Sequence, residues 1–376
     1  MKKKRHSKRD NKQQHCIIVG CIAFAALCFL TLFSQYTDDV TELVGAAVLK
    51  NKCDTTPASY VLVGSNDNYI YALDANKGCV AWKFDTTADV KSKPALYGNT
   101  IYIGTAGDEF YSLSLADGSQ YWKADTGKIF GAAVADSSYA YVGDNTGALS
   151  AYSSGEAAWT YTAHNIKADV QLDNSILYIV DEYLKVGTVR AIGAATHAQK
   201  WAFSAKSQIL APPLITTDAL YVPSNENTLY KVSKQYGVPI WTFKSTKSIR
   251  TTPVMDDKGI LYFGSNDGYL YAVDSATGAL VWKYLFNAEI SSSPAADADA
   301  VYVAVKDTVY AFDTATRAIA WKKTIAGKIS AALTLHDGTL FVPSTDYTLY
   351  VLNAETGEQK WSYKTSGALY AGVTVT

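Results

Sequence analysis

GSNDGYLYAVDSATGALVW, residues 264–282, is the clearest repeat unit of this 376-residue chain and indicates its fold. Its Asn, Asp and Gly at 266–268 favour a tight hairpin turn, because these residues tolerate a positive φ. Residues 269–273 are aromatic and apolar, which is typical of a strand inside a sheet. A second turn at 277–278 leads into a strand that carries Trp282. Upstream, 253–255 and 260–263 predict two more strands, so the unit contains four antiparallel strands.

Trp282 is one of eight tryptophans, and all of them occupy the same position of a repeat. Successive tryptophans lie 37 to 42 residues apart, and none is left over. A period near forty with one aromatic residue per unit indicates an array of identical units that bury their apolar faces against one another. Four antiparallel strands per unit are typical of a propeller blade. The eight are Trp82, Trp122, Trp159, Trp201, Trp241, Trp282, Trp321 and Trp361.

The sequence therefore predicts an all-β, eight-bladed β-propeller over residues 58–376. Blade one lacks its own first strand, whereas residues 367–376 have the pattern of the inner strand that follows every other tryptophan. Pairing this C-terminal strand with blade one would close the ring and remove a free sheet edge. Blade four departs from the repeat, because Val180 replaces a glycine and additional residues precede Trp201.

The N-terminal segment predicts a membrane anchor before the propeller. Residues 1–15 carry seven cationic side chains against Asp10, and residues 16–33 carry no charge. Eighteen residues of helix span about 27 Å, close to the hydrocarbon thickness of a bilayer. We expect a basic cytoplasmic tail (1–15), a transmembrane signal anchor (16–33), a linker (34–57) and a propeller in the periplasm or outside.

Two alternatives to this inner-membrane, single-pass arrangement remain. The N-terminus could be a cleaved signal of a secreted protein, or residues 18–21 could be a lipoprotein box with Cys21 as the acylated residue. Charge excludes one class of partner in every case. The whole chain has a net charge of −1, so the part after residue 15 has a net charge of −7. This acidic part has no electrostatic footprint for nucleic acid.

The quoted stretch matches the signature Ala-x-Asp-x-x-x-Gly-x-x-x-Trp, and residues 72–82 match it again. On these residues the chain resembles the PQQ-like repeat family of quinoprotein-type propellers, over about residues 58 to 376. The resemblance implies that each tryptophan docks between neighbouring blades. It also implies two contrasting functional classes, because the family includes both enzymes and non-catalytic scaffolds.

The enzymes of the family are dehydrogenases that hold pyrroloquinoline quinone at the propeller axis. The alcohol dehydrogenases stack the quinone between a tryptophan and a vicinal disulfide. Every tryptophan here belongs to a blade, and the sequence has no Cys-Cys pair and no Cys-x-x-Cys-His. The histidines His164, His197 and His336 fall on different turns, which argues against one metal or one catalytic base. We expect no catalytic residue, cofactor or metal site.

The second class is the propeller lipoprotein of the outer-membrane β-barrel assembly machinery, which presents loops to other subunits. The chain is similar to it in length, repeat and blade number, but has short between-blade loops and an anchor-like N-terminus. The resemblance implies a non-catalytic protein-interaction scaffold of the bacterial cell envelope. Its partners would be envelope proteins, including the barrel assembly machinery. A PQQ-dependent dehydrogenase and a polysaccharide- or ligand-binding propeller are the alternatives.

The candidate partner contacts lie in the loops between blades and in irregular blade four. An aliphatic residue follows nearly every tryptophan by seven or eight positions, with cationic residues beside it. In the alternative interpretation these aliphatic residues plug the gaps between blades. The candidates are Lys128, Ile129, Asp181, Glu182, Lys185, Arg190, Lys247, Arg250 and Lys328.

Two cysteines lie beyond the apolar segment, at 53 and 79. The strand order of blade one places both on the same rim. In an oxidising compartment we expect Cys53 and Cys79 to form a disulfide that joins the linker to the first blade. The alternative is two unpaired thiols.

Overall fold

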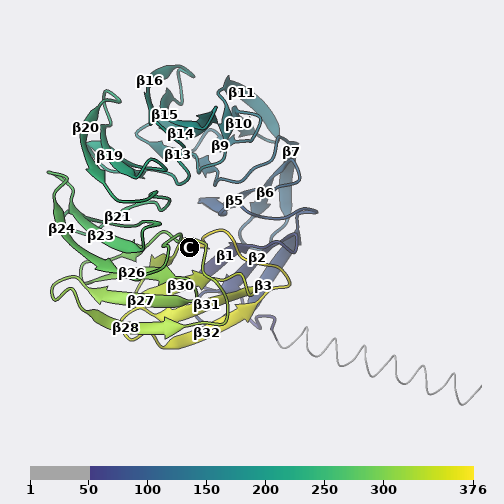
Figure 1. Ribbon diagram of the computed structural model, residues 1–376. Helices are drawn as coiled ribbons and strands as arrows, with labels where there is room; N and C mark the ends of the chain where they lie inside the picture. The colour runs from purple at the N-terminus through teal and green to yellow at the C-terminus, as the bar shows by residue number, and fades with distance from the viewer. Residues whose placement is uncertain (1–50) are drawn as a thin grey trace, which may run out of the picture. The chain divides into compact units, whose positions relative to one another are not determined.

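Eight antiparallel sheets follow one another around a ring over residues 55–376, and Figure 1 shows them as the blades of a propeller. The computed structural model describes residues 51–376, so the predictions for the basic tail, the transmembrane anchor and most of the linker lie outside the described residues. Among residues 51–376, no helix is long and apolar enough to cross a membrane. The prediction of an all-β propeller with eight blades is confirmed.

The first half of the ring comprises three blades of four strands and a fourth blade of five. Blade one contains, in sheet order, β33 (Thr374–Val375), β1 (Tyr60–Gly64), β2 (Tyr69–Asp74) and β3 (Val80–Asp85), and blade two contains β4 (Ala95–Tyr97), β5 (Thr100–Gly104), β6 (Glu109–Ser114) and β7 (Gln120–Asp125). Blade three contains β8 (Val134–Ala135), β9 (Ala140–Gly143), β10 (Ala148–Ser153) and β11 (Glu156–Thr162). Blade four contains β12 (Asn165–Ile166), β13 (Gln171–Asp173), β14 (Ile176–Tyr183), β15 (Val186–Gly193) and β16 (Gln199–Ser204).

The second half of the ring is more regular. Blade five contains β17 (Leu214–Ile215), β18 (Ala219–Ser224), β19 (Thr228–Ser233) and β20 (Pro239–Lys244), and blade six contains β21 (Val254–Met255), β22 (Ile260–Gly264), β23 (Tyr269–Asp274) and β24 (Leu280–Leu285). Blade seven contains β25 (Ala295–Ala296), β26 (Ala300–Val305), β27 (Thr308–Asp313) and β28 (Ile319–Thr324), and blade eight contains β29 (Thr334–His336), β30 (Thr339–Pro343), β31 (Thr348–Asn353) and β32 (Gln359–Lys364).

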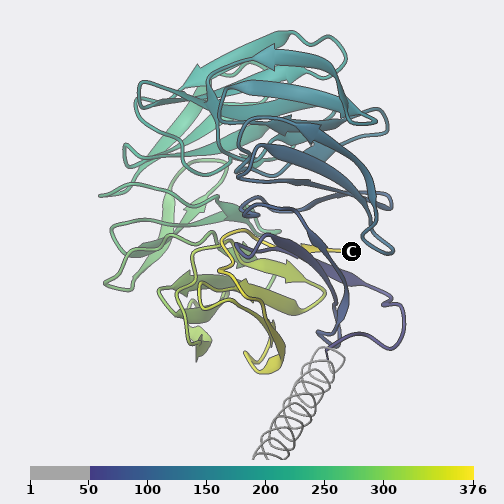
Figure 2. The same cartoon turned by 90° about the vertical axis from the view of Figure 1, so that its right-hand side faces the viewer.

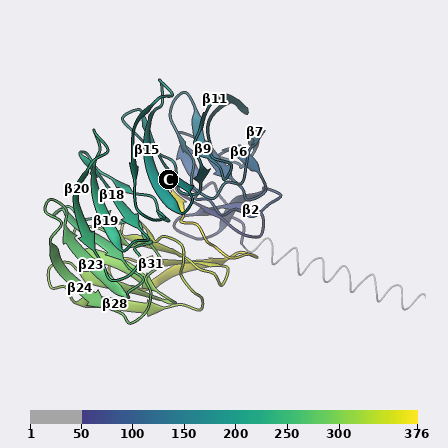
Figure 3. The ribbon, with the colours of Figure 1, turned by 45° about the horizontal axis from the view of Figure 1, so that its top comes forward.

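The C-terminal strand closes the ring, as the sequence predicted. Strand β33 pairs antiparallel with β1, with Val375 opposite Val61 and Thr374 opposite Leu62. The backbone N–H of Thr376 donates to the carbonyl of Tyr60 at 3.1 Å. Figures 2 and 3 show the yellow C-terminal segment entering the ring beside the purple strands of blade one. Blade one is therefore assembled from both ends of the described chain.

The two middle strands of each blade form the core. All five residues of β1 are buried, and β22 and β26 are buried except for their first residue. These strands are nearly continuous apolar runs because neighbouring blades cover both of their faces. The outer strands alternate between half-buried and exposed positions, as in β32.

The repeat signature has one physical meaning, which is contact between blades. The tryptophan of one blade packs against the glycine turn of the next: a Cβ at Gly118 would lie 2.5 Å from the Trp82 ring. Gly118 also has a φ of +72°, which glycine adopts without strain. The indole N–H of Trp82 donates to the carbonyl of Leu115 at 2.8 Å. The last tryptophan, Trp361, donates in the same way to Ala75 in blade one.

The aspartate of the signature shapes that turn. The Asp74 carboxylate accepts hydrogen bonds from the backbone N–H groups of Asn76 and Lys77, at 2.8 and 2.9 Å. Asp274 and Asp313 bond the corresponding positions of blades six and seven. The Asp therefore folds the turn, and the Gly lets it approach the ring.

Blade four departs from the repeat in its turn residue, in its innermost strand and in the length of its hairpin. The turn glycine, which is Gly118 in blade two, is replaced in blade four by His197. This histidine keeps a positive φ of 57° and stacks on Trp159 with ring centroids 4.4 Å apart. The innermost strand is split in two, because β12 and β13 pair with opposite halves of β14. Strands β14 and β15 have eight residues each, so their hairpin is longer than the others.

Two glycines of blade two separate backbone strain from blade packing. We expect Gly98→Ala to lower the free energy of unfolding by about 1 kcal/mol, because only the positive φ is strained. A Cβ at Gly98 meets nothing within 4 Å. Gly118→Ala should cost about 1 to 3 kcal/mol more, because it also overpacks the Trp82 ring. Denaturant unfolding of both variants measures the difference, and equal losses would contradict the docking role of the glycine.

Closure of the ring can be tested by deleting residues 367–376. The deletion removes β33 together with Leu369 and Val373, which are both fully buried. Loss of one buried leucine alone typically costs about 2 to 5 kcal/mol, and the open edge favours aggregation. We expect the truncated protein to lose its cooperative thermal transition or to aggregate. Thr376→Ala is the control and should cost about 1 kcal/mol; an unchanged melting temperature of the truncated protein would refute closure.

Candidate interaction surface

The aliphatic residues after the tryptophans are plugs between blades and not surface contacts. Their exposed fractions are between 0% and 5%: Val90, Ile129, Ile166, Ile209, Ile249, Ile290, Ile329 and Leu369. Ile129 packs so closely on Gly104 that a Cβ there would lie 2.2 Å from it. The prediction of Ile129 as a partner contact is thus wrong, because its side chain fills the gap that the glycine leaves.

The cationic candidates of the same loops are exposed. Lys128, Lys247, Arg250 and Lys328 all present their side chains to solvent. Backbone bonds fix these loops: the carbonyl of Lys128 accepts from Asn145, and that of Lys328 from Thr345, both at 3.0 Å. The between-blade loops therefore carry positive charge on a rigid frame.

The long hairpin of blade four ends in an exposed apolar tip, which we define as Tyr183, Leu184 and Lys185. Tyr183 is 57% exposed and Leu184 is 79% exposed. Leu184 and Lys185 have positive φ angles of 50° and 67°. Two-residue hairpin turns of this kind prefer Asn-Gly or Asp-Gly. A leucine at such a position is unfavourable for both the backbone and the solvent.

A buried ionic network supports the tip from below. Asp181 has a side chain only 1% exposed, and its carboxylate accepts bonds from Arg190 at 2.7 and 3.1 Å. His164 lies 3.0 Å from the same carboxylate. The hydrogen bond with Asp181 raises the pKa of the Arg190 guanidinium above its ordinary value. Asp181 was predicted as a partner contact, and its burial corrects this: it holds the hairpin in place.

The network extends to the neighbouring strands. Arg190 also donates to the side-chain oxygen of Gln199 at 2.8 Å, and the Tyr161 hydroxyl of blade three donates to the same oxygen. Glu182 accepts a bond from Gln208 at 2.9 Å. Of the blade-four residues that the sequence singled out, only Lys185 belongs to the tip.

The sequence singles out the irregular stretch 181–190 but not Tyr183 and Leu184 in particular, which carry the largest exposed apolar area of this hairpin. The signal was present in the repeat. Where blade six has Asn266, Asp267 and Gly268 in its turn, blade four has an aromatic and a leucine. Their place at the turn, and not inside a strand, required the strand register that the structure supplies.

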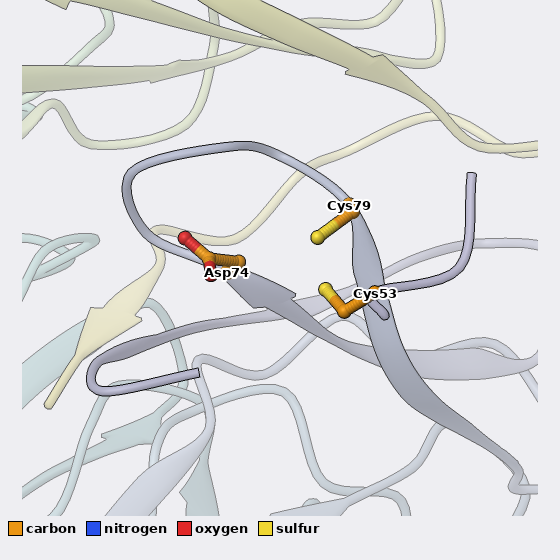
Figure 4. Close-up of side chains that lie close together, drawn as sticks. All are labelled: Cys53, Asp74 and Cys79. Atoms are coloured by element: carbon orange, nitrogen blue, oxygen red, sulfur yellow. The ribbon is translucent and has the colours of Figure 1, made fainter. Parts of the chain in front are cut away.

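The three histidines among residues 51–376 each have separate partners. His164 belongs to the ionic network, His197 stacks on Trp159, and His336 lies 3.5 Å from Asp337. In the described part of the chain, one group of side chains has metal-ligand spacing: Cys53, Asp74 and Cys79, shown in Figure 4. Both cysteines are disulfide-bonded, and Asp74 is engaged in its turn, so this group offers no thiolate ligand.

Thiol titration tests whether Cys53 and Cys79 are bonded to each other. The chain has five cysteines, so the disulfide would leave three titratable thiols in the denatured, non-reduced protein. Cys53→Ser should then raise the number by one, because it releases Cys79. Without the disulfide, the same substitution would lower the number by one. Cys28→Ser is the control and lowers the number in either case.

A cavity of about 300 Å³ lies where the between-blade loops meet. Its lining includes Lys91, Lys93, Phe130, Arg250 and Tyr370, but no tryptophan and no cysteine. The stacking pair that the quinone-dependent alcohol dehydrogenases use is therefore not available in this lining. This lining does not fit a quinone held in that way.

Comparison with known families and structures agrees with this architecture. The family model described as outer membrane protein assembly factor BamB matches residues 44–163, 145–287 and 266–375. The structure is similar to the crystal structure of BamB from Moraxella catarrhalis, with a TM-score of 0.65 and 16% identity, covering 78% of this chain and 95% of that one. No curated protein sequence matches the chain significantly.

Other propellers are similar to a comparable degree. The quinohemoprotein alcohol dehydrogenase from Comamonas testosteroni has a TM-score of 0.63 and 11% identity, and the match covers 87% of this chain and 71% of the enzyme. Saccharomyces cerevisiae Sqt1 has a TM-score of 0.65 and 13% identity, with 74% and 86% coverage. At these identities the likeness establishes the fold alone.

Proposed function

We infer the role of this chain from the family of outer membrane protein assembly factor BamB, to which it belongs, and propose that it is a non-catalytic protein-interaction scaffold of the bacterial cell envelope. The family match spans nearly the whole propeller. Within the envelope, we propose a role in outer-membrane protein assembly, with subunits of the barrel assembly machinery as partners.

The observation that carries the proposal is the exposed apolar tip on a rigid base. Tyr183 and Leu184 present apolar area to solvent, while the carboxylate of Asp181 beneath them is buried and paired with the half-buried Arg190. Breaking such a pair is costly, so the network fixes the hairpin in one position. An exposed tyrosine on a fixed base is typical of an interface centre, where tyrosine is enriched.

We propose that the propeller works outside the cytoplasm, joined to the inner membrane by residues 16–33 with the basic tail inside. The charge asymmetry of residues 1–15 and the apolar run after them support this orientation. A lipoprotein or a cleaved, secreted form would place the same propeller in the same compartment.

A quinoprotein dehydrogenase is the competing function, favoured by the similarity to the Comamonas testosteroni enzyme. Against it stands the commitment of the tryptophans to blade interfaces, of which Trp82, Trp201 and Trp321 bond the next blade. Dye-linked oxidation of alcohols or sugars, after addition of the quinone and calcium, would support the dehydrogenase function instead.

Site-specific crosslinking tests the scaffold proposal. A photoreactive residue at position 184 of the full chain should crosslink to a barrel-assembly subunit in the envelope, identified by mass spectrometry. The same residue at 236 is the matched control, because Tyr236 is 65% exposed on a turn of blade five. Identical products from both positions, or none from 184, would contradict the proposal.

A double variant separates contact from folding. Leu184→Asn with Lys185→Gly gives the hairpin the turn sequence it prefers, so the melting temperature should stay equal or rise. The apolar tip is lost, and capture of the partner should fall about tenfold or more, as for a hot-spot side chain. Full capture by this variant would place the interface elsewhere.

A further inference from the structure

A second surface surrounds the axis of the propeller. In each of the eight between-blade loops, we consider the residue that directly follows the buried aliphatic plug. These eight residues form a ring. In ring order these are Lys91, Phe130, Lys167, Leu210, Arg250, Ser291, Ser330 and Tyr370. All except Lys167 line the 300 Å³ cavity between these loops. Neighbours in this ring come from adjacent blades, because sequence order is blade order.

The ring has an ordered composition. Starting from Tyr370 and passing through the ring closure, apolar and cationic side chains alternate over six positions: Tyr370, Lys91, Phe130, Lys167, Leu210 and Arg250. The two remaining positions are serines. An arc of this kind offers alternate apolar and cationic contacts at successive blades.

The charge of this ring is opposite to that of the chain around it. Residues after the basic tail have a net charge of −7, yet the ring contains three cations and no carboxylate. Lys93 lines the same cavity and makes no hydrogen bond or ion pair with any other described residue. Two acids lie close to the ring: Asp89 pairs with Lys91 at 3.1 Å, and Asp169, which also lines the cavity, accepts a bond from the Ala132 backbone at 2.7 Å. Lys93 and Arg250 are therefore the lining cations that have no carboxylate partner among the described residues.

The apolar members of the ring stand at its rim. Leu210 is 45% exposed and Tyr370 is 48% exposed. The cavity is at the lower limit of pockets that enclose small molecules, which measure about 300 to 1,000 Å³. A small anion could bind the cations but would leave both rim residues in water. A chain segment crossing the mouth would cover them.

We propose that the axial mouth, defined as Lys91, Lys93, Phe130, Leu210, Arg250 and Tyr370, binds an acidic peptide segment of a partner protein. In this peptide segment, carboxylate side chains alternate with apolar or aromatic side chains. The carboxylates pair with Lys93 and Arg250, and the apolar side chains cover Leu210 and Tyr370. Charge complementarity selects this partner and speeds its association. The inference rests on the proposed scaffold role and assigns it a second, separate contact.

Fluorescence anisotropy with the full chain tests the proposal. The probe is a fluorescein-labelled synthetic peptide in which Glu or Asp alternates with Phe, Tyr and Leu. Its control is the same peptide with Gln and Asn in place of the acids. We expect the acidic peptide to bind at least about tenfold more tightly than the amide peptide, with an affinity that falls as salt is added.

Charge-matched variants locate the site. Lys93→Gln with Arg250→Gln should weaken acidic-peptide binding by about tenfold, because two charge-assisted contacts are lost. Lys244→Gln with Lys364→Gln removes the same charge from exposed positions on outer strands and should change binding by less than about twofold. Leu210→Ser should also weaken binding, because it removes an apolar rim contact.

Three outcomes would overturn the proposal. The first is equal binding of the acidic and amide peptides, and the second is equal binding by the two double variants. The third is displacement of the peptide by inorganic phosphate at concentrations similar to the peptide's own Kd, which would indicate a small-anion pocket. The Leu184→Asn, Lys185→Gly variant should bind the peptide normally. If the peptide fails to bind while crosslinking at 184 persists, the peptide-binding proposal is refuted and the scaffold proposal stands.

Discussion

The docking of each tryptophan onto the positive-φ turn of the next blade, which is usually a glycine turn, is the interaction on which the rest of the structure depends. A single four-stranded blade has two apolar faces and cannot cover either alone. The Trp82 ring and the Gly118 turn bring two such faces together, and the indole N–H fixes their register by its bond to Leu115. Repeated around the ring, this contact leaves the blades with no free face, and Trp361 completes the circuit at Ala75.

The same constraint explains how much of the molecule its sequence could predict. Tryptophan spacing indicated the ring, and the terminal strand pattern indicated its closure, because both arise from periodic packing. The surface is different. Ile129 and Phe130 are adjacent in one loop, yet one is fully buried and the other lines the cavity. Spacing locates such a loop but cannot tell which of two neighbours faces inward, so the sequence leaves Ile129 open as either a partner contact or a plug between blades.

Blade four shows where the repeat allows specialisation. His197 preserves the positive φ of the glycine that it replaces and offers a stacking ring to Trp159. The blade interface survives by this exchange of one contact for another. Its longer hairpin is then free to carry a carboxylate network and an apolar tip that no other blade has in the same form. In the proposed function, the interaction site is a local exception placed on a regular frame.

The closure of blade one also determines when the propeller can be completed during synthesis. The hydrogen bond from Ser59 to Thr376 joins residues that are 317 positions apart. Ribosomes add about 5 to 20 residues per second, so the first strand waits roughly 15 to 60 seconds for its partner. Loop closure over such a distance is also slow relative to local hairpins. During this interval the first blade has an uncovered edge, so the nascent protein depends on whatever shields that edge until the last strand arrives.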